Sequence, residues 1–152
     1  MELKARNDIE APIGYTFDKI TDFPGFERQA LRRGAYVRRR DTLSKPGLGS
    51  AWELKFSYRG KDRVMRPTIT EWEKPNGYVV KSISGGLEIT ATIDLMPLTP
   101  ARTRLSITID IVPKSLTARL LVQSLRLARG SLTKKLEARL NRFSRDIEAR
   151  YS

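Results

Sequence analysis

The chain has 152 residues and a formal net charge of +12, from 29 Lys or Arg against 17 Asp or Glu. It contains neither cysteine nor histidine, which excludes thiolate nucleophiles, histidine general bases, zinc sites built on those residues, and disulfides. We therefore expect no metal and no cofactor, and the length suits a single domain over residues 1–152 with its own core.

The N-terminal segment predicts one strand followed by two short helices. Residues 2–10 alternate between uncharged and charged side chains, which is typical of a half-buried strand. Apolar residues then recur at helical spacing over 12–20, with a proline in the first turn. A second short helix over 24–31 is predicted because Asp22 can cap its start and Gly34 can end it.

The middle of the sequence predicts a meander of antiparallel strands. Short turn sequences separate the segments, and Asn76-Gly77 and Gly85-Gly86 are strong signals for two-residue hairpin turns, whereas Arg59-Gly60 is a weaker one. The predicted strands are 35–42, 50–58, 61–73, 78–84, 87–96 and 102–112.

These turns also predict which residues face each other, because opposed residues in an antiparallel pair point to the same side of the sheet. The predicted pairs are Phe56 with Arg63, Leu54 with Met65, Trp52 with Pro67, Glu71 with Ser82, Ile69 with Ser84, Ser82 with Ile89, Val80 with Ala91, and Tyr78 with Ile93. One face is then largely apolar, and Ile107 extends it on the last strand. The other face collects Lys55, Arg66, Thr68, Thr70, Lys81, Thr90, Thr92 and Asp94.

After Pro113 the apolar residues recur every three or four positions, which predicts one amphipathic helix from about 115 to 150. Ser115 is a suitable N-cap. Such a helix is longer than one sheet needs, so Gly130 marks a bend or the end of the helix overhangs the sheet. The predicted inward stripe consists of Leu121, Leu125, Ala128, Leu132, Leu136, Leu140, Phe143 and Ile147.

The order of these elements resembles the START-like, birch-pollen-allergen-like superfamily called SRPBCC, whose bacterial members include polyketide cyclase/dehydrase and lipid-transport proteins. The likeness covers essentially the whole chain and is carried by "IEAPIGYTFDKITDF", "ITEWEKPNGY" and "TRLSITIDI". It implies an α+β helix-grip fold, with a curved sheet of about seven strands around a long C-terminal helix and a cavity for hydrophobic ligands between them. Quinone-binding relatives carry a Trp and a Leu-Pro pair that "DFPGFERQAL" lacks, so a quinone is only one candidate ligand.

The residues expected to line that cavity come from the inward face of the strands and from the long helix. Arg63 could receive a carboxylate or phosphate at the cavity mouth, or could simply be solvated. The full set of predicted ligand-binding residues is Trp52, Leu54, Phe56, Arg63, Met65, Ile69, Tyr78, Val80, Ser82, Ile89, Ala91, Ile107, Leu121 and Leu125.

Glu71 is the candidate catalytic residue, because the predicted turn places its carboxylate on the inward face beside Ser82. Burial against apolar walls would raise the pKa of such a group and let it act as an acid, a base or an anchor for a ligand hydroxyl. The alternative is that Glu71 lies at the solvated rim near Pro75.

The sequence therefore predicts a protein that binds or transports a hydrophobic small molecule such as a lipid, a quinone or a polyketide-like compound. The alternatives are a metal-free cyclase or dehydratase acting on such a ligand, and a basic nucleic-acid-binding module, which the absence of a recognition motif disfavours. The basic terminal helix leaves open a contact with an anionic membrane surface. We expect a cytoplasmic location, at the membrane periphery if that contact is made.

Overall fold

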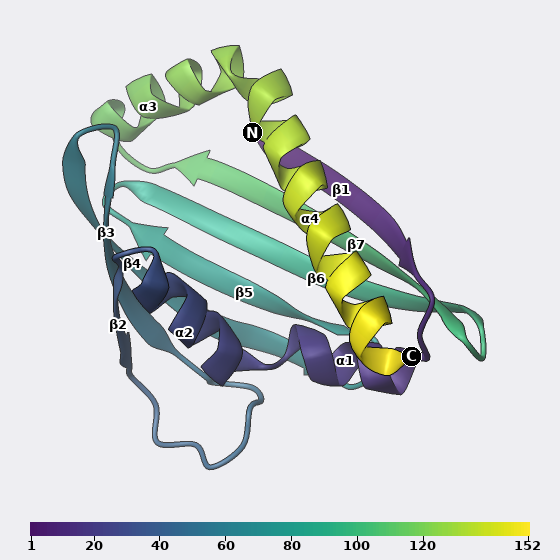
Figure 1. Cartoon of the computed structure of the whole chain (residues 1–152). Coiled ribbons are helices and arrows are strands. Elements are labelled where there is room, and N and C mark those ends of the chain that lie inside the picture. The colour runs from purple at the N-terminus through teal and green to yellow at the C-terminus, as the bar shows by residue number, and fades with distance from the viewer.

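The computed structural model describes residues 1–152 and contains one seven-stranded sheet and four helices (Figure 1). The strands are β1 (Glu2–Ile9), β2 (Tyr36–Arg39), β3 (Trp52–Tyr58), β4 (Lys61–Glu73), β5 (Gly77–Ser84), β6 (Leu87–Thr99) and β7 (Arg102–Pro113). The helices are α1 (Ile13–Ile20), α2 (Phe23–Arg32), α3 (Leu116–Leu127) and α4 (Arg129–Tyr151). None of these helices is both long and apolar enough to cross a membrane.

All neighbouring strands are antiparallel, in the order β1-β7-β6-β5-β4-β3-β2. The first strand therefore pairs with the last one, and the remaining strands follow as a meander. The helices lie on one side of the curved sheet (Figure 1), which we call its inner face. The predicted α+β helix-grip architecture is confirmed.

Capping side chains fix the ends of two helices as predicted. A carboxylate oxygen of Asp22 accepts a hydrogen bond from the backbone N–H of Gly25 at 3.2 Å, and the hydroxyl oxygen of Ser115 accepts one from that of Ala118 at 3.1 Å. Each bond satisfies a backbone donor that the first turn of a helix leaves free.

The single C-terminal helix predicted over 115–150 is in fact two helices. Ala128 ends α3 and precedes α4, and the two run in different directions (Figure 1). Gly130 lies in the first turn of α4, where its weak helix propensity makes an interruption less costly. The bend therefore occurs two residues before the predicted one, and it sends α3 across one end of the sheet while α4 packs along β1.

The hairpin registers predicted for β3–β4 and β5–β6 are confirmed, but the one predicted for β4–β5 is wrong. Glu73 pairs with Gly77, so the connection is the three-residue stretch 74–76 rather than the two residues Asn76-Gly77. Ile69 consequently pairs with Val80, and the register then shifts by one residue before Glu71, which pairs with Val79.

Two strands differ in length from their predictions by three residues or more. The strand predicted over 35–42 is shorter, because the carboxylate of Asp41 accepts hydrogen bonds from the backbone N–H groups of Leu43 and Ala51 at 2.9 and 2.7 Å and begins the following loop. The strand predicted over 87–96 continues to Thr99, with an irregularity after Pro97.

The hydrophobic core is divided into two separate clusters. The larger one joins α1, α2 and α4 to the sheet and includes the fully buried Phe17, Ile69 and Leu105. The smaller one joins α3 to β7 through Ile111 and Val122, together with Leu125. The helices therefore cover the two ends of the inner face more completely than the region between them.

Gly77 should be essential for the β4–β5 connection. Its φ of 149° is unfavourable for other residues, and an added Cβ would overlap the carbonyl oxygen of Ile93 on β6. We expect Gly77→Ala to lower the free energy of unfolding by more than about 1 kcal/mol in urea denaturation. Gly47→Ala is the matched control, since a Cβ there meets no atom and the backbone is unstrained. Equal stability of the two variants would contradict this account.

Candidate ligand site

The inner face carries apolar side chains that the helices leave partly uncovered. Nearby positions on the same face, such as Ile69 and Leu105, are almost completely buried, so this partial exposure is local. Ala91 lies between the two core clusters and belongs to neither. Half-buried apolar residues of the strands on this face include Leu54, Phe56, Met65, Val80, Ile89, Ala91, Ile93, Ile107 and Ile109. Most of them touch the edge of a core cluster, whereas Phe56, Met65 and Ala91 pack against neither cluster. Such a surface offers a hydrophobic ligand apolar contacts that the protein itself does not satisfy.

An apolar pocket of about 150 Å³ opens where α2 packs against β2, β3 and β4. One wall is fixed, because the rings of Phe23 and Trp52 meet edge to face at 4.9 Å. The indole N–H of Trp52 donates a hydrogen bond to the Glu27 carboxylate at 2.7 Å, which holds the ring in place. The lining residues are Phe23, Phe26, Glu27, Ala30, Val37, Trp52, Leu54 and Pro67.

A second opening of about 410 Å³, which we call the basic window, lies between the tip of the β3–β4 hairpin, the β5–β6 turn and the start of α3. It exists because β4 pairs with β5 only from Arg66 onward, while Lys61–Met65 pairs with β3 alone. The hairpin tip thus separates from the rest of the sheet. The lining residues are Lys61, Asp62, Arg63, Val64, Ser84, Gly85, Gly86, Leu87, Ser115, Thr117, Ala118 and Leu121.

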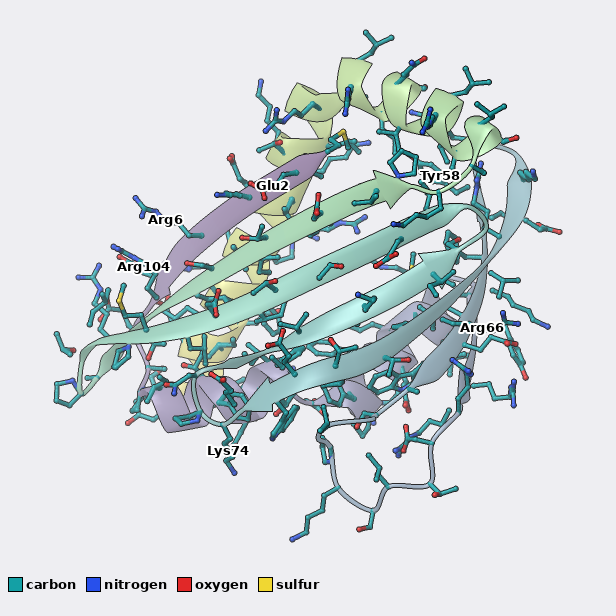
Figure 2. All side chains as sticks on the ribbon, turned by 180° about the vertical axis from the view of Figure 1, so that it is seen from behind. Glu2, Arg6, Tyr58, Arg66, Lys74 and Arg104 are labelled. Carbon is teal, nitrogen blue, oxygen red and sulfur yellow. The ribbon has the colours of Figure 1, made fainter.

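Arg63 is positioned in this window by its neighbours on the hairpin. It pairs with Phe56, its Nε donates a hydrogen bond to the backbone oxygen of Tyr58 at 3.2 Å, and its guanidinium lies 5.6 Å from the centre of the Tyr58 ring. Figure 2 shows Tyr58 at the hairpin tip beside α3. Arg59 donates a hydrogen bond to the Ser124 hydroxyl of α3 at 2.6 Å, so the tip is tied to that helix.

The structure distributes the predicted ligand-binding residues over several environments. Trp52 and Leu54 line the apolar pocket, and Arg63 and Leu121 line the basic window. Six further positions are half-buried on the strands: Phe56, Met65, Val80, Ile89, Ala91 and Ile107. The remaining four are buried: Ile69, Tyr78, Ser82 and Leu125.

Tyr78 is buried in the larger core cluster and lines neither opening. Its hydroxyl donates a hydrogen bond to the backbone oxygen of Ile20 at 2.7 Å, which ties α1 to β5. Burial raises the pKa of this phenol above its ordinary value, so the side chain stays neutral. Its ring stacks on Trp72 at 5.8 Å within the larger cluster.

The predicted inward position of Glu71 is wrong. The one-residue shift after Ile69 pairs Glu71 with Val79, and the carboxylate is exposed on the outer face of the sheet. A bulge of this kind reverses the side on which the following residue emerges. Glu71 therefore does not reach the inner face, and the pairing with Ser82 on which its proposed role depended does not form.

Two acidic residues of the outer face, Glu53 and Glu88, form ion pairs with neighbouring cations. Glu53 accepts a hydrogen bond from Arg66 at 3.1 Å, and that contact lowers the pKa of the carboxyl despite the opposing effect of burial. Figure 2 shows Arg66 and Arg104 on the side of the sheet turned away from the helices. No three acidic side chains come together in a way that could hold a metal ion.

The wall contributed by α2 was not predicted from the sequence. Phe23, Phe26, Glu27 and Ala30 have the i, i+3, i+4, i+7 spacing of one helix face, so the pattern was present. What the pattern lacks is the position of the helix relative to β3, which only tertiary packing supplies. Glu27 is the carboxylate that this packing brings to the inner face, where it bonds Trp52.

Comparison with solved structures agrees with the helix-grip architecture. The ZhuI aromatase/cyclase from Streptomyces sp. R1128 superposes with a TM-score of 0.69 at 14% identity, covering 100% of this chain and 96% of that one. A protein from Thermus thermophilus gives 0.65 at 17% identity, with 100% of both chains covered. A START superfamily protein from Mycobacterium smegmatis gives 0.58 at 15% identity, covering 93% and 97%.

No family model and no curated protein sequence matches the chain. The similarity is therefore one of structure, and it extends over the whole chain. The chain has the helix-grip fold that these solved structures share, the fold that the sequence resemblance implied.

Because Glu71 is exposed on the outer face, Glu71→Gln should leave the ligand site unchanged. We expect the affinity for a hydrophobic probe and the free energy of unfolding each to stay within about 0.5 kcal/mol of the parent. Titration with N-phenylnaphthylamine and urea denaturation measure the two quantities. A loss of binding at unchanged stability would show that Glu71 contributes to the ligand site.

Proposed function

We propose that the protein binds a hydrophobic small molecule on the inner face of its sheet. The observation that carries this proposal is the set of apolar side chains on the inner face that stay half-buried, with Phe56, Met65 and Ala91 packed against neither core cluster. Leaving apolar area exposed inside a fold costs about 25 cal/mol per Å², and a ligand that covers it recovers that free energy. The apolar pocket beside α2 gives such a ligand an anchoring point.

The solved structures with this fold support binding of a hydrophobic small molecule in general, and a lipid, a quinone or a polyketide-like compound is the proposed ligand. One neighbour is described as an aromatase/cyclase and another as a START superfamily protein. At these levels of identity they support the fold and leave the ligand to be identified. Native mass spectrometry of the purified protein would detect a compound that copurifies with it.

An enzyme acting on the same ligand is a less well supported alternative. Its proposed acid or base, Glu71, lies on the outer face. The carboxylate of Glu27 reaches the inner face, but it accepts the indole hydrogen bond of Trp52 and lines the apolar pocket. Acid–base catalysis would need a further proton-transferring side chain on the inner face, whereas binding and transport need none.

A large side chain on the inner face should weaken binding without unfolding the protein. Ala91 belongs to neither cluster, and a phenyl ring at this position would occupy the space in which we propose that the ligand binds. We expect Ala91→Phe to weaken binding of N-phenylnaphthylamine, a neutral fluorescent probe, by at least about tenfold, or ~1.4 kcal/mol.

The adjacent Thr92→Phe is the matched control, because Thr92 pairs with Val79 on the outer face and its substitution should leave binding unchanged. Thermal unfolding of both variants shows whether the fold is retained. Undiminished probe binding by a folded Ala91→Phe variant would refute the inner face as the site.

A second proposed role is contact with an anionic membrane through α3. The buried side of this helix packs on β7 through Val122 and Leu125, yet three leucines on its other side face solvent. Leu116, Leu120 and Leu127 are 79%, 67% and 92% exposed. Exposed leucines at helical spacing are suited to insertion among lipid acyl chains.

The charge around these leucines favours lipid of negative charge. Arg119 and Arg126 belong to the same helix, and no acidic residue occurs between 111 and 136. Each basic residue near an anionic membrane contributes about 1 kcal/mol of attraction, which salt weakens. The basic window lies at the start of the same helix, so this orientation would direct an opening of the ligand site toward the lipid.

Replacing the three exposed leucines by serine (Leu116→Ser, Leu120→Ser, Leu127→Ser) should therefore abolish cosedimentation with phosphatidylserine-containing liposomes at low salt. The matched control replaces three exposed apolar residues elsewhere, Leu31, Leu48 and Met96, by serine and should keep binding. Binding of nucleic acid but not of liposomes, or dimerisation lost only in the α3 variant, would assign the surface to another partner.

A further inference from the structure

The two openings of the ligand site differ in chemistry. The apolar pocket presents two phenylalanine rings, an indole and aliphatic side chains, with Glu27 already bonded to Trp52. The basic window presents Arg63 and Lys61 together with hydroxyl groups from the β5–β6 turn and the start of α3. A ligand that spans both must be apolar at one end and polar at the other.

Apolar side chains of β3 and β4 lie between the two openings. Pro67 lines the apolar pocket and Arg63 lines the window, and this separation of four positions corresponds to about 13 Å of extended strand. Met65 lies between them on the inner face and pairs with Leu54 of β3. Phe56 pairs with Arg63 itself, so apolar contacts continue up to the guanidinium.

The positive charge in the window is not neutralised by the protein. Neither Arg63 nor Lys61 takes part in any of the ion pairs of the structure. Asp62, the acidic residue among the lining residues, pairs with Ser57 and accepts the hydrogen bond of that hydroxyl at 2.9 Å. Because side chains alternate along a strand, its carboxylate emerges on the side opposite to that of Arg63.

The guanidinium keeps donors available for a ligand. Its Nε–H is used by the backbone oxygen of Tyr58, and contact with the Tyr58 ring restricts its position, while no hydrogen bond within the protein uses its terminal NH₂ groups. A guanidinium fixed in this way binds carboxylates and phosphates through paired N–H donors.

We propose that the ligand is an amphiphile with a terminal anionic group, a carboxylate or a phosphate, which Arg63 binds in the window while the apolar chain runs over Met65 into the pocket beside α2. This inference rests on the proposed binding function and adds the chemical class of the ligand. Lys61 supplies further positive charge at the entrance. An uncharged or cationic head group would leave both cations without a partner.

Titrations with three probes that share one chain test the proposal: dodecanoate, dodecyl phosphate and dodecanol. The two anions are kept below their micellar concentrations and the alcohol below its solubility limit, and binding is followed by displacement of N-phenylnaphthylamine. We expect both anions to bind at least about tenfold more tightly than the alcohol, as a charge-assisted hydrogen bond allows. Arg63→Met should remove this preference and leave dodecanol binding unchanged, and Arg63→Lys should restore part of it.

Arg6→Met is the matched control, because Arg6 is an exposed arginine on β1 without a hydrogen bond or ion pair, and it should keep the preference. Equal affinity of the parent protein for the acid and the alcohol, or an unchanged preference in folded Arg63→Met, would overturn the assignment to Arg63 while leaving hydrophobic binding intact. Failure of all three probes to bind would instead contradict the proposed function together with this inference.

Discussion

The alternation of side chains along paired strands determines the rest of this structure. Seven strands place one set of mainly apolar residues on a single concave face, and that face must be covered. Four helices provide the cover, but the break at Ala128 sends α3 to one end of the sheet and α4 along β1. The core consequently forms two clusters instead of one, and apolar strand residues between them stay half exposed.

The β3–β4 hairpin tip separates from β5 because the pairing of β4 with β5 is incomplete. The bulge between Ile69 and Glu71 and the limited β4–β5 pairing are local departures from an ideal sheet, and both occur on the strand that crosses the site. Bulges increase strand twist and commonly accompany functional sites. Here the departing tip opens the basic window, and Arg59 fixes the width of that opening by bonding Ser124 on α3.

Sequence patterns predicted the faces of the sheet more reliably than its register. The error in the pairing of Ile69 was four residues, and because side chains repeat every two residues, Ile69 and Val80 still faced inward. A bulge adds a single residue, so it moved Glu71 to the opposite face. Nothing in the local sequence marks that bulge, since no glycine occurs there, and the wall made by α2 depends on contacts between segments distant in sequence.

The acidic residues explain where the excess positive charge remains. On the outer face single carboxylates pair with two cations each: Glu53 contacts Arg38 and Arg66, and Glu88 contacts Lys81 and Lys114. Each of these carboxylates offsets only part of the charge of its two cations, and neither of them reaches the window or α3. Unpaired cations, exposed leucines and an opening to the apolar inner face therefore occur at one end of the molecule. Mutual repulsion among like charges costs stability, and an anionic partner at that end would relieve it.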